Sequence, residues 1–270
     1  MSRSSGREAL LPEHPRPLLF AHRGCSSLAP ENTMEAFSLA KQLGAPGLEL
    51  DIHLCKSGEL VVLHDDSLMR TTGLDRPVED CTWDEIRDLD AGSWKAPQFS
   101  HCRLPLLQEV LETFLPDLYI DIELKTRRAG ADPLPEALAI MLKSFGKRAE
   151  GHISVSSFNP LALRAFKRSS ERLGLHIPTA VIWCDDPELP SYLHHGEGRW
   201  ISGCDYLKPI HNKVNRGFVT LLGQLGRRPI VPWTVDEVDL ARTMLQLGCE
   251  GLITNRPQDI LPVLKDVSHG

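Results

Sequence analysis

The sequence predicts an α/β protein, a TIM-type (β/α)8 barrel with a small insertion after the second strand. Strand-like and helix-like segments alternate along most of the 270 residues. They form about eight repeats of about 34 residues, which suits a barrel of this type. The alternative is an open doubly wound sheet, but its G-x-G-x-x-G pattern does not follow the first predicted strand.

The charge and hydropathy of the chain exclude several classes of function. With 30 basic and 36 acidic residues the net charge is −6, whereas proteins that coat nucleic acid are usually basic. The longest apolar run, 137–142, is much shorter than a membrane span. We therefore expect no nucleic-acid partner and no integral membrane association, and the oligomeric state stays open.

The cysteines and the N-terminal residues indicate the cellular compartment to expect. Seven cysteines occur singly, without a C-x-x-C pair, which favours free thiols in a reducing compartment. Residues 1–16 are polar and lack the apolar stretch of a secretory signal. We expect a cytoplasmic protein with a polar, disordered segment at 1–16 and a single barrel domain at 17–270.

Two strands are predicted in the first part of the chain, at 17–22 and 47–54. Between them a helix is expected to begin at Asn32, because Glu35 lies three residues later as in a capping box. Residues 60–64 form a further extended run.

The alternation then stops between residues 65 and 116, a stretch too long for a plain connection, and we interpret it as an insertion or a small subdomain. Two short helices are expected within it, one starting at Thr82 and one at 106–114.

The strand–helix alternation resumes after the insertion. Strands are predicted at 118–124, 152–156, 178–183, 203–208, 229–234 and 251–254. Helices are predicted at 133–147, from Asn159, at 214–225, from Thr234 to Leu247, and from Pro257. Capping signals predict where two of these helices begin. They are an Asn-Pro pair at 159–160, and Thr234 followed three residues later by Glu237.

Polar groups gather at the predicted strand ends, where parallel barrels carry catalysis. His22 and Arg23 follow the first strand, and His64 ends the extended run. Glu49 and Asp51 occupy alternate positions of the second strand and therefore face the same side. Two such carboxylates are costly to bury, and a divalent cation between them removes the repulsion.

Another strand places Glu123 and Lys125 on one face. The acids Glu49, Asp51 and Glu123 carry −3, and the cations Arg23 and Lys125 carry +2, so the site is near −1. A divalent ion would bring the site to +1, which attracts an anion. All-oxygen ligands favour Mg²⁺ or Ca²⁺ over zinc. The alternative is a purely structural charge cluster.

The remaining residue types suit phosphate chemistry. Arginine and lysine beside a metal suit phosphate recognition, and two histidines suit paired acid and base roles. Three neighbours are expected in supporting positions: His53 at the rim, Asp121 deeper in the barrel, and Asp65 capping its loop or orienting His64.

A series of motifs occurs in order along the chain. They are His22-Arg23-Gly24, the segments 29–37, 47–51, 62–65 and Arg70-Thr71-Thr72-Gly73, and then 121–125, 157–158, 232–235 and 251–257. Together they resemble the glycerophosphodiester phosphodiesterases, over nearly the whole chain. That family is a TIM barrel with a small insertion after the second strand, which the 65–116 stretch resembles.

The resemblance implies a role for each matching residue. Glu49, Asp51 and Glu123 would bind one divalent cation, His22 and His64 would be the acid–base pair, Arg23 and Lys125 would hold the phosphate, and Trp233 would line the substrate pocket. For Trp233, plain packing is the alternative. One departure is Asn255, where the family often has aspartate; we expect Asn255 to cap the last helix equally well.

The implied activity is metal-dependent hydrolysis of glycerophosphodiesters, such as glycerophosphocholine and glycerophosphoethanolamine, to sn-glycerol 3-phosphate and an alcohol. The sequence leaves open the alcohol, the choice of cation, which histidine is the acid, and whether water or the neighbouring glycerol hydroxyl attacks. Three alternatives are a lysophospholipase D-type activity on single-chain lipids, a non-catalytic phosphodiester binder and an enolising metal-dependent barrel.

Overall fold

The computed structural model describes residues 16–126, 132–187 and 189–268, so the segment predicted at 1–16 lies outside the described residues apart from Arg16. The strands are β1 (Leu18–His22), β2 (Gly47–Leu54), β3 (Leu60–Val62), β4 (Tyr119–Leu124), β5 (Ile153–Ser157), β6 (Thr179–Trp183), β7 (Tyr206–Pro209) and β8 (Gly251–Thr254). The α-helices are α1 (Met34–Gln42), α2 (Met69–Thr72), α3 (Trp83–Ile86), α4 (Leu107–Phe114), α5 (Leu134–Phe145), α6 (Pro160–Arg172), α7 (Gly198–Ser202), α8 (Arg216–Phe218), α9 (Val238–Leu247) and α10 (Pro257–Ser268). Shorter turns of helix are η1 (Val78–Asp80), η2 (Pro97–Phe99), η3 (Gly146–Arg148), η4 (Ser191–Leu193), η5 (His211–Lys213) and the π-helix η6 (Val219–Leu225).

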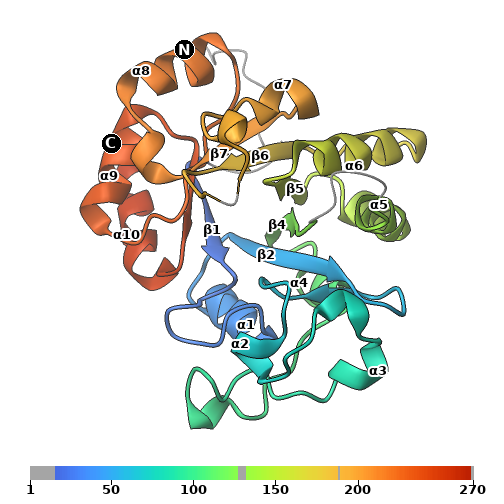
Figure 1. The fold of residues 1–270 in the computed structure, drawn as a ribbon. Coiled ribbons are helices and arrows are strands. Elements are labelled where there is room, and N and C mark those ends of the chain that lie inside the picture. The colour runs from blue at the N-terminus through green and yellow to red at the C-terminus, as the bar shows by residue number, and fades with distance from the viewer. Residues whose placement is uncertain (1–15, 127–131, 188, 269–270) are drawn as a thin grey trace.

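Parallel strands in the order β7-β6-β5-β4-β2-β1-β8 form the wall of the barrel (Figure 1). The segment 229–235 fills the gap between the two outer strands. Its Val231 N–H donates to Leu207 of β7 at 2.9 Å, and the Ile253 N–H of β8 donates to Pro232 at 3.0 Å. These bonds close the sheet on itself, and the predicted (β/α)8 barrel is confirmed.

The seventh barrel strand is less regular than predicted. Residues 229–234 make only isolated bridges, Leu207↔Ile230 and Ile210↔Trp233, rather than a continuous ladder. The physical reason is that Pro229 and Pro232 have no N–H to donate to a neighbouring strand.

The segment between β2 and β4 builds a second, smaller core beside the barrel. β3 pairs antiparallel with β2, and its alternate side chains face opposite ways. Leu60 and Val62 belong to the barrel core, whereas Val61 and Leu63 belong to the small core with residues from 55 to 104. In Figure 1, α2 and α3 lie beyond β2, away from α6 and α9.

Helix α4 differs from α2 and α3, because it packs on the barrel itself. Its buried side chains Leu107, Val110, Leu111 and Phe114 all belong to the barrel core. The helix predicted at 106–114 is therefore confirmed, and so is the capping box between Thr82 and Glu85 at the start of α3.

Two predicted helix starts are wrong. Helix α1 is capped by Thr33, whose hydroxyl accepts from the Ala36 N–H at 3.2 Å. Asn32 has a left-handed backbone with φ of 55° and donates its side-chain amide to Asp51 instead. Helix α9 begins at Val238 rather than after Thr234, because Val235 still bonds to Ile253 of β8.

The other departures from prediction are local. The helix predicted at 214–225 is a short α8 followed by the π-helix η6. β7 starts at Tyr206 rather than at residue 203, because Gly203 ends α7 in a left-handed conformation.

All seven cysteines are free and buried. Within the described ranges, we find no helix with the length and apolar content that a bilayer crossing requires.

Candidate active site

Strand register brings the predicted polar residues to one end of the barrel. His22 at the end of β1 lies opposite Glu49 on β2, and Asp51 lies opposite Glu123 on β4. His22 ends β1, and Asp51 and Glu123 lie in the carboxyl-terminal halves of β2 and β4. That is the end at which barrel enzymes carry their active sites, and Glu49 is level with His22.

Glu49, Asp51 and Glu123 form a tight acidic cluster. All three are buried, and one carboxylate oxygen from each lies within 4.8 Å of the others. Burial and the neighbouring Asp51 raise the pKa of Glu49 well above its ordinary value. The pKa of Asp51 is lowered: its burial acts in the opposite direction, but the charges of Arg23 and Lys125 outweigh it.

The cluster fits a hard divalent cation. The Oδ1 atom of Asp51 is buried and accepts no hydrogen bond from the described residues, although the Lys125 ammonium lies 3.7 Å away. A buried polar atom without a hydrogen bond costs free energy. Oxygen donors alone are the ligand set that Mg²⁺ and Ca²⁺ prefer.

Arg23 and Lys125 flank the acids. The Arg23 Nε lies 3.3 Å from Asp51, and its backbone N–H donates to Glu49 at 3.2 Å. Arg23 has a φ of 54°, a strained backbone for a residue with a side chain. The Lys125 ammonium lies 3.0 Å from Glu123 and 3.7 Å from Asp51. Two cations are thus held against the three acids.

His22 is held in one tautomer by its neighbours. Its Nδ1 lies 2.7 Å from Asn255 Oδ1, while the Asn255 amide nitrogen donates to Asp236 at 2.7 Å. Because Asn255 presents its oxygen to the imidazole, Nδ1 carries the proton and Nε2 is the free acceptor, 3.8 Å from Glu49. Burial, together with the charge of Arg23, lowers the pKa of His22 to about 3.

His64 has an anionic partner. Its Nδ1 lies 2.7 Å from Asp65, and the side chain is 31% exposed. Asp65 in turn accepts from Arg70. Burial would raise the pKa of Asp65, but the hydrogen bonds from Arg70 and His64 prevail and lower it to about 2. Asp65 therefore orients His64, one of the two arrangements predicted from the sequence.

A cavity of about 690 Å³ opens over these groups. Both histidines, both cations, Glu49 and Glu123 line it. Trp233 lines it too, packed edge-on against Phe158 at 5.6 Å between ring centroids. All eight predicted site residues therefore meet at one end of the barrel, with Asp51 buried beneath the cavity.

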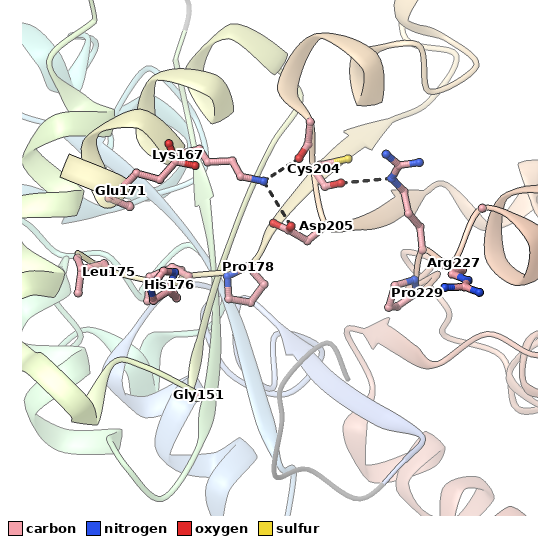
Figure 2. Close-up of a pocket in the computed structure, with 15 residues that line it drawn as sticks. Gly151, Lys167, Glu171, Leu175, His176, Pro178, Cys204, Asp205, Arg227 and Pro229 are labelled. Carbon is pink, nitrogen blue, oxygen red and sulfur yellow. Dashed lines mark hydrogen bonds and ion pairs between the residues drawn. The ribbon is translucent and has the colours of Figure 1, made fainter. Parts of the chain in front are cut away.

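A larger cavity of about 940 Å³ lies at the opposite end, where β6 and β7 begin (Figure 2). Lys167 bonds there to Asp205 and to the Gly203 carbonyl, and Arg228 bonds to the Cys204 carbonyl. That end of a barrel serves stability rather than chemistry, so volume does not identify the active site.

A buried ion pair adjoins the acidic cluster, and its cation, Lys208, also lines the cavity. Asp121 binds Lys208 at 2.7 Å and accepts from Tyr206 at 3.0 Å and from Ser154 at 3.2 Å. The deep position predicted for Asp121 is confirmed. Sequence reasoning missed Lys208, although a lysine within the short apolar strand Tyr206–Pro209 was a usable signal.

Two predictions about individual residues are wrong. His53 is fully buried rather than at the rim, because β3 and the insertion cover the end of β2. Asn255 does not cap the last helix through its side chain. The Asn255 oxygen accepts from His22 and Ser26, and its amide binds Asp236.

A closed barrel with acids, cations and two histidines at one end is typical of enzymes that cleave phosphate esters. The family model described as the glycerophosphoryl diester phosphodiesterase family matches residues 22–259. The chain belongs to this family, and it is an enzyme, a phosphoric diester hydrolase.

Similar proteins agree with this assignment. A glycerophosphodiester phosphodiesterase of Caldanaerobacter subterraneus subsp. tengcongensis is 32% identical, over 93% of this chain and 98% of the relative. One of Bacillus altitudinis is 31% identical, over 92% of this chain and 98% of the relative. A phosphodiesterase of Oleispira antarctica, solved with the product sn-glycerol-3-phosphate, is 26% identical, with a TM-score of 0.75 over 93% of this chain and 97% of that structure.

Proposed function

We propose that this enzyme hydrolyses glycerophosphodiesters, such as glycerophosphocholine, to sn-glycerol 3-phosphate and an alcohol, by acid–base catalysis between His22 and His64. The observation that carries the proposal is the arrangement of the cavity: two histidines with different hydrogen-bond partners face a space that also holds the acidic cluster and two cations. The product bound to the Oleispira antarctica enzyme supports the substrate class.

We further propose that Glu49, Asp51 and Glu123 hold one divalent cation, Mg²⁺ or Ca²⁺. The family generally depends on such ions, and the burial and convergence of the three carboxylates support the assignment. When bound, the ion polarises a phosphoryl oxygen and offsets negative charge in the transition state.

Arg23 and Lys125 would bind the phosphate oxygens. Both line the cavity, and both are held in place by the acids that they flank. Preorganised cations of this kind stabilise charge that develops during reaction without having to reorganise. Trp233 and Phe158 would form the apolar wall against the organic part of the substrate.

The hydrogen-bond partners of the two histidines favour a different proton transfer for each. His22 carries its proton on Nδ1 and offers Nε2 as an acceptor, which suits the base that deprotonates the attacking hydroxyl. His64 donates to the carboxylate of Asp65. Asp65 fixes the orientation of this imidazole beside the cavity, which suits the acid that protonates the departing alcohol.

The decisive experiment is a panel of glycerophosphodiesters assayed for release of glycerol 3-phosphate. We expect turnover with added Mg²⁺ or Ca²⁺, loss of turnover with chelator, and recovery when the ion is restored. Glycerophosphocholine and its acylated form would be compared, because preference for the acylated form would favour the lysophospholipase D-type alternative. Binding without turnover in both ions would reject the proposal.

A further inference from the structure

The motif Arg70-Thr71-Thr72-Gly73 meets the site described above through Arg70, which donates to Asp65. It forms the single turn α2 in the insertion, and Gly73 ends that turn with a left-handed φ of 79°. Arg70 points back from the insertion toward the barrel, as its contacts show.

The Arg70 guanidinium holds two carboxylates at once. Its Nε and Nη2 bind Asp65 at 2.5 and 3.1 Å, and its Nη1 and Nη2 bind Glu31 at 3.0 and 2.7 Å. The two acids come from different loops, Glu31 from the segment between β1 and α1 and Asp65 from the segment after β3. The ring of Trp94 covers the guanidinium at 5.5 Å.

Each of these carboxylates also binds a residue that lines the cavity. Glu31 accepts from Arg23 at 2.8 Å, and Asp65 pairs with His64 at 2.7 Å. Arg70 therefore joins two separate chains of contacts, Arg70–Glu31–Arg23 and Arg70–Asp65–His64. The Glu31 side chain is only 13% exposed, so solvent screens the first chain weakly.

We propose that Arg70 is a positioning residue of the active site, which fixes Arg23 through Glu31 and His64 through Asp65. This inference rests on the proposed roles of Arg23 and His64. The proposal gives the insertion a function. The α2 turn of the insertion supplies Arg70, which sets the distance between Arg23, on the phosphate-binding side of the cavity, and His64, on the proton-donating side.

The geometry requires arginine rather than any cation. A guanidinium presents five N–H donors in a rigid plane and can serve two carboxylates bidentately, whereas an ammonium is a point charge without that fork. A lysine at this position would retain the charge but could not bind both carboxylates in this arrangement.

The test compares Arg70→Lys with Arg76→Lys. Arg76 is a matched control: it lies in the same insertion, its side chain is also 41% exposed, and it makes an ion pair with Glu85. We expect Arg70→Lys to lower kcat about 10- to 100-fold, as misplacement of reacting groups does. Arg76→Lys should leave kcat unchanged, and the thermal midpoints of the two variants should be similar.

A second measurement separates positioning from general loss of structure. In the double variant Glu31→Ala, Asp65→Ala the side-chain acceptors of Arg70 are absent, so adding Arg70→Lys should change kcat by less than about twofold. If Arg70→Lys fails to fold, the double variant alone tests the inference, because the kcat of the double variant should itself be lower than that of the wild type.

Three outcomes would overturn the inference. They are an Arg70→Lys enzyme with wild-type kcat, a full additional loss in the double-variant background, and a double variant with wild-type kcat. A wild-type enzyme with no turnover of any glycerophosphodiester would instead reject the proposed function, and the inference with it.

Discussion

Removing the charge of Lys208 should strongly destabilise the barrel. Lys208 is 1% exposed and Asp121 is fully buried, with 2.7 Å between their charged atoms. Lys208→Met would leave the Asp121 carboxylate buried without its cation, which typically costs about 3–5 kcal/mol. Because Tyr206 and Ser154 still donate to Asp121, we expect the lower end, about 3 kcal/mol.

The measurement is the free energy of unfolding from urea denaturation, with the thermal midpoint as a second readout. At about 2–4 °C per kcal/mol for a chain of this size, the midpoint should fall by about 6–12 °C. The matched control is Lys208→Met combined with Asp121→Asn, which removes the unpaired charge and keeps the two hydroxyl contacts. The reasoning fails if the single variant loses less than about 1 kcal/mol, or if the double variant is no more stable than the single one.

Three further predictions concern the site. His22→Ala and His64→Ala should each lower kcat about 100-fold or more in the glycerol 3-phosphate assay, and wild-type turnover in either variant would reject that role. Asp51→Asn should raise the Mg²⁺ or Ca²⁺ concentration needed for half-maximal activity, and an unchanged requirement would remove Asp51 from the ligand set. The lowered pKa of Asp65, about 2, means that ionised Asp65 stabilises the fold above its unfolded pKa of about 3.9. This contribution is lost as pH falls through about 2, so the difference in unfolding free energy between wild type and Asp65→Asn should shrink from pH 5 to pH 2; a constant difference would contradict it.

The sequence was most informative where local periodicity and tertiary structure agree. Alternation in β2 places Glu49 and Asp51 on one side of the strand. The parallel pairing of β2 with β4 then brings Glu123 opposite Asp51. The rule that strand ends carry catalysis located His22 and His64 for the same reason. These residues could be predicted because their positions depend on the periodicity of single strands.

Other features depend on contacts that no local pattern contains. Asn32 and Asn255 both look like helix caps, yet each side chain bonds to a site residue distant in sequence, Asp51 and His22 respectively. His53 is buried because β3 folds back over β2. The lysine within Tyr206–Pro209 signals a buried charge, but its partner Asp121 lies on a different strand and is not contained in that local pattern.

The interrupted strand at 229–235 has a consequence for motion. Two of the seven residues of this seam, Pro229 and Pro232, offer no amide to their neighbours, so fewer bonds must break for it to separate than for the continuous β2–β4 ladder. Local opening in proteins follows such differences in backbone bonding. The amides of Val231 and Trp233 should therefore exchange with deuterium sooner than those of Leu50 and Ile122, and the wall that carries Trp233 yields more easily than the wall formed by β2 and β4.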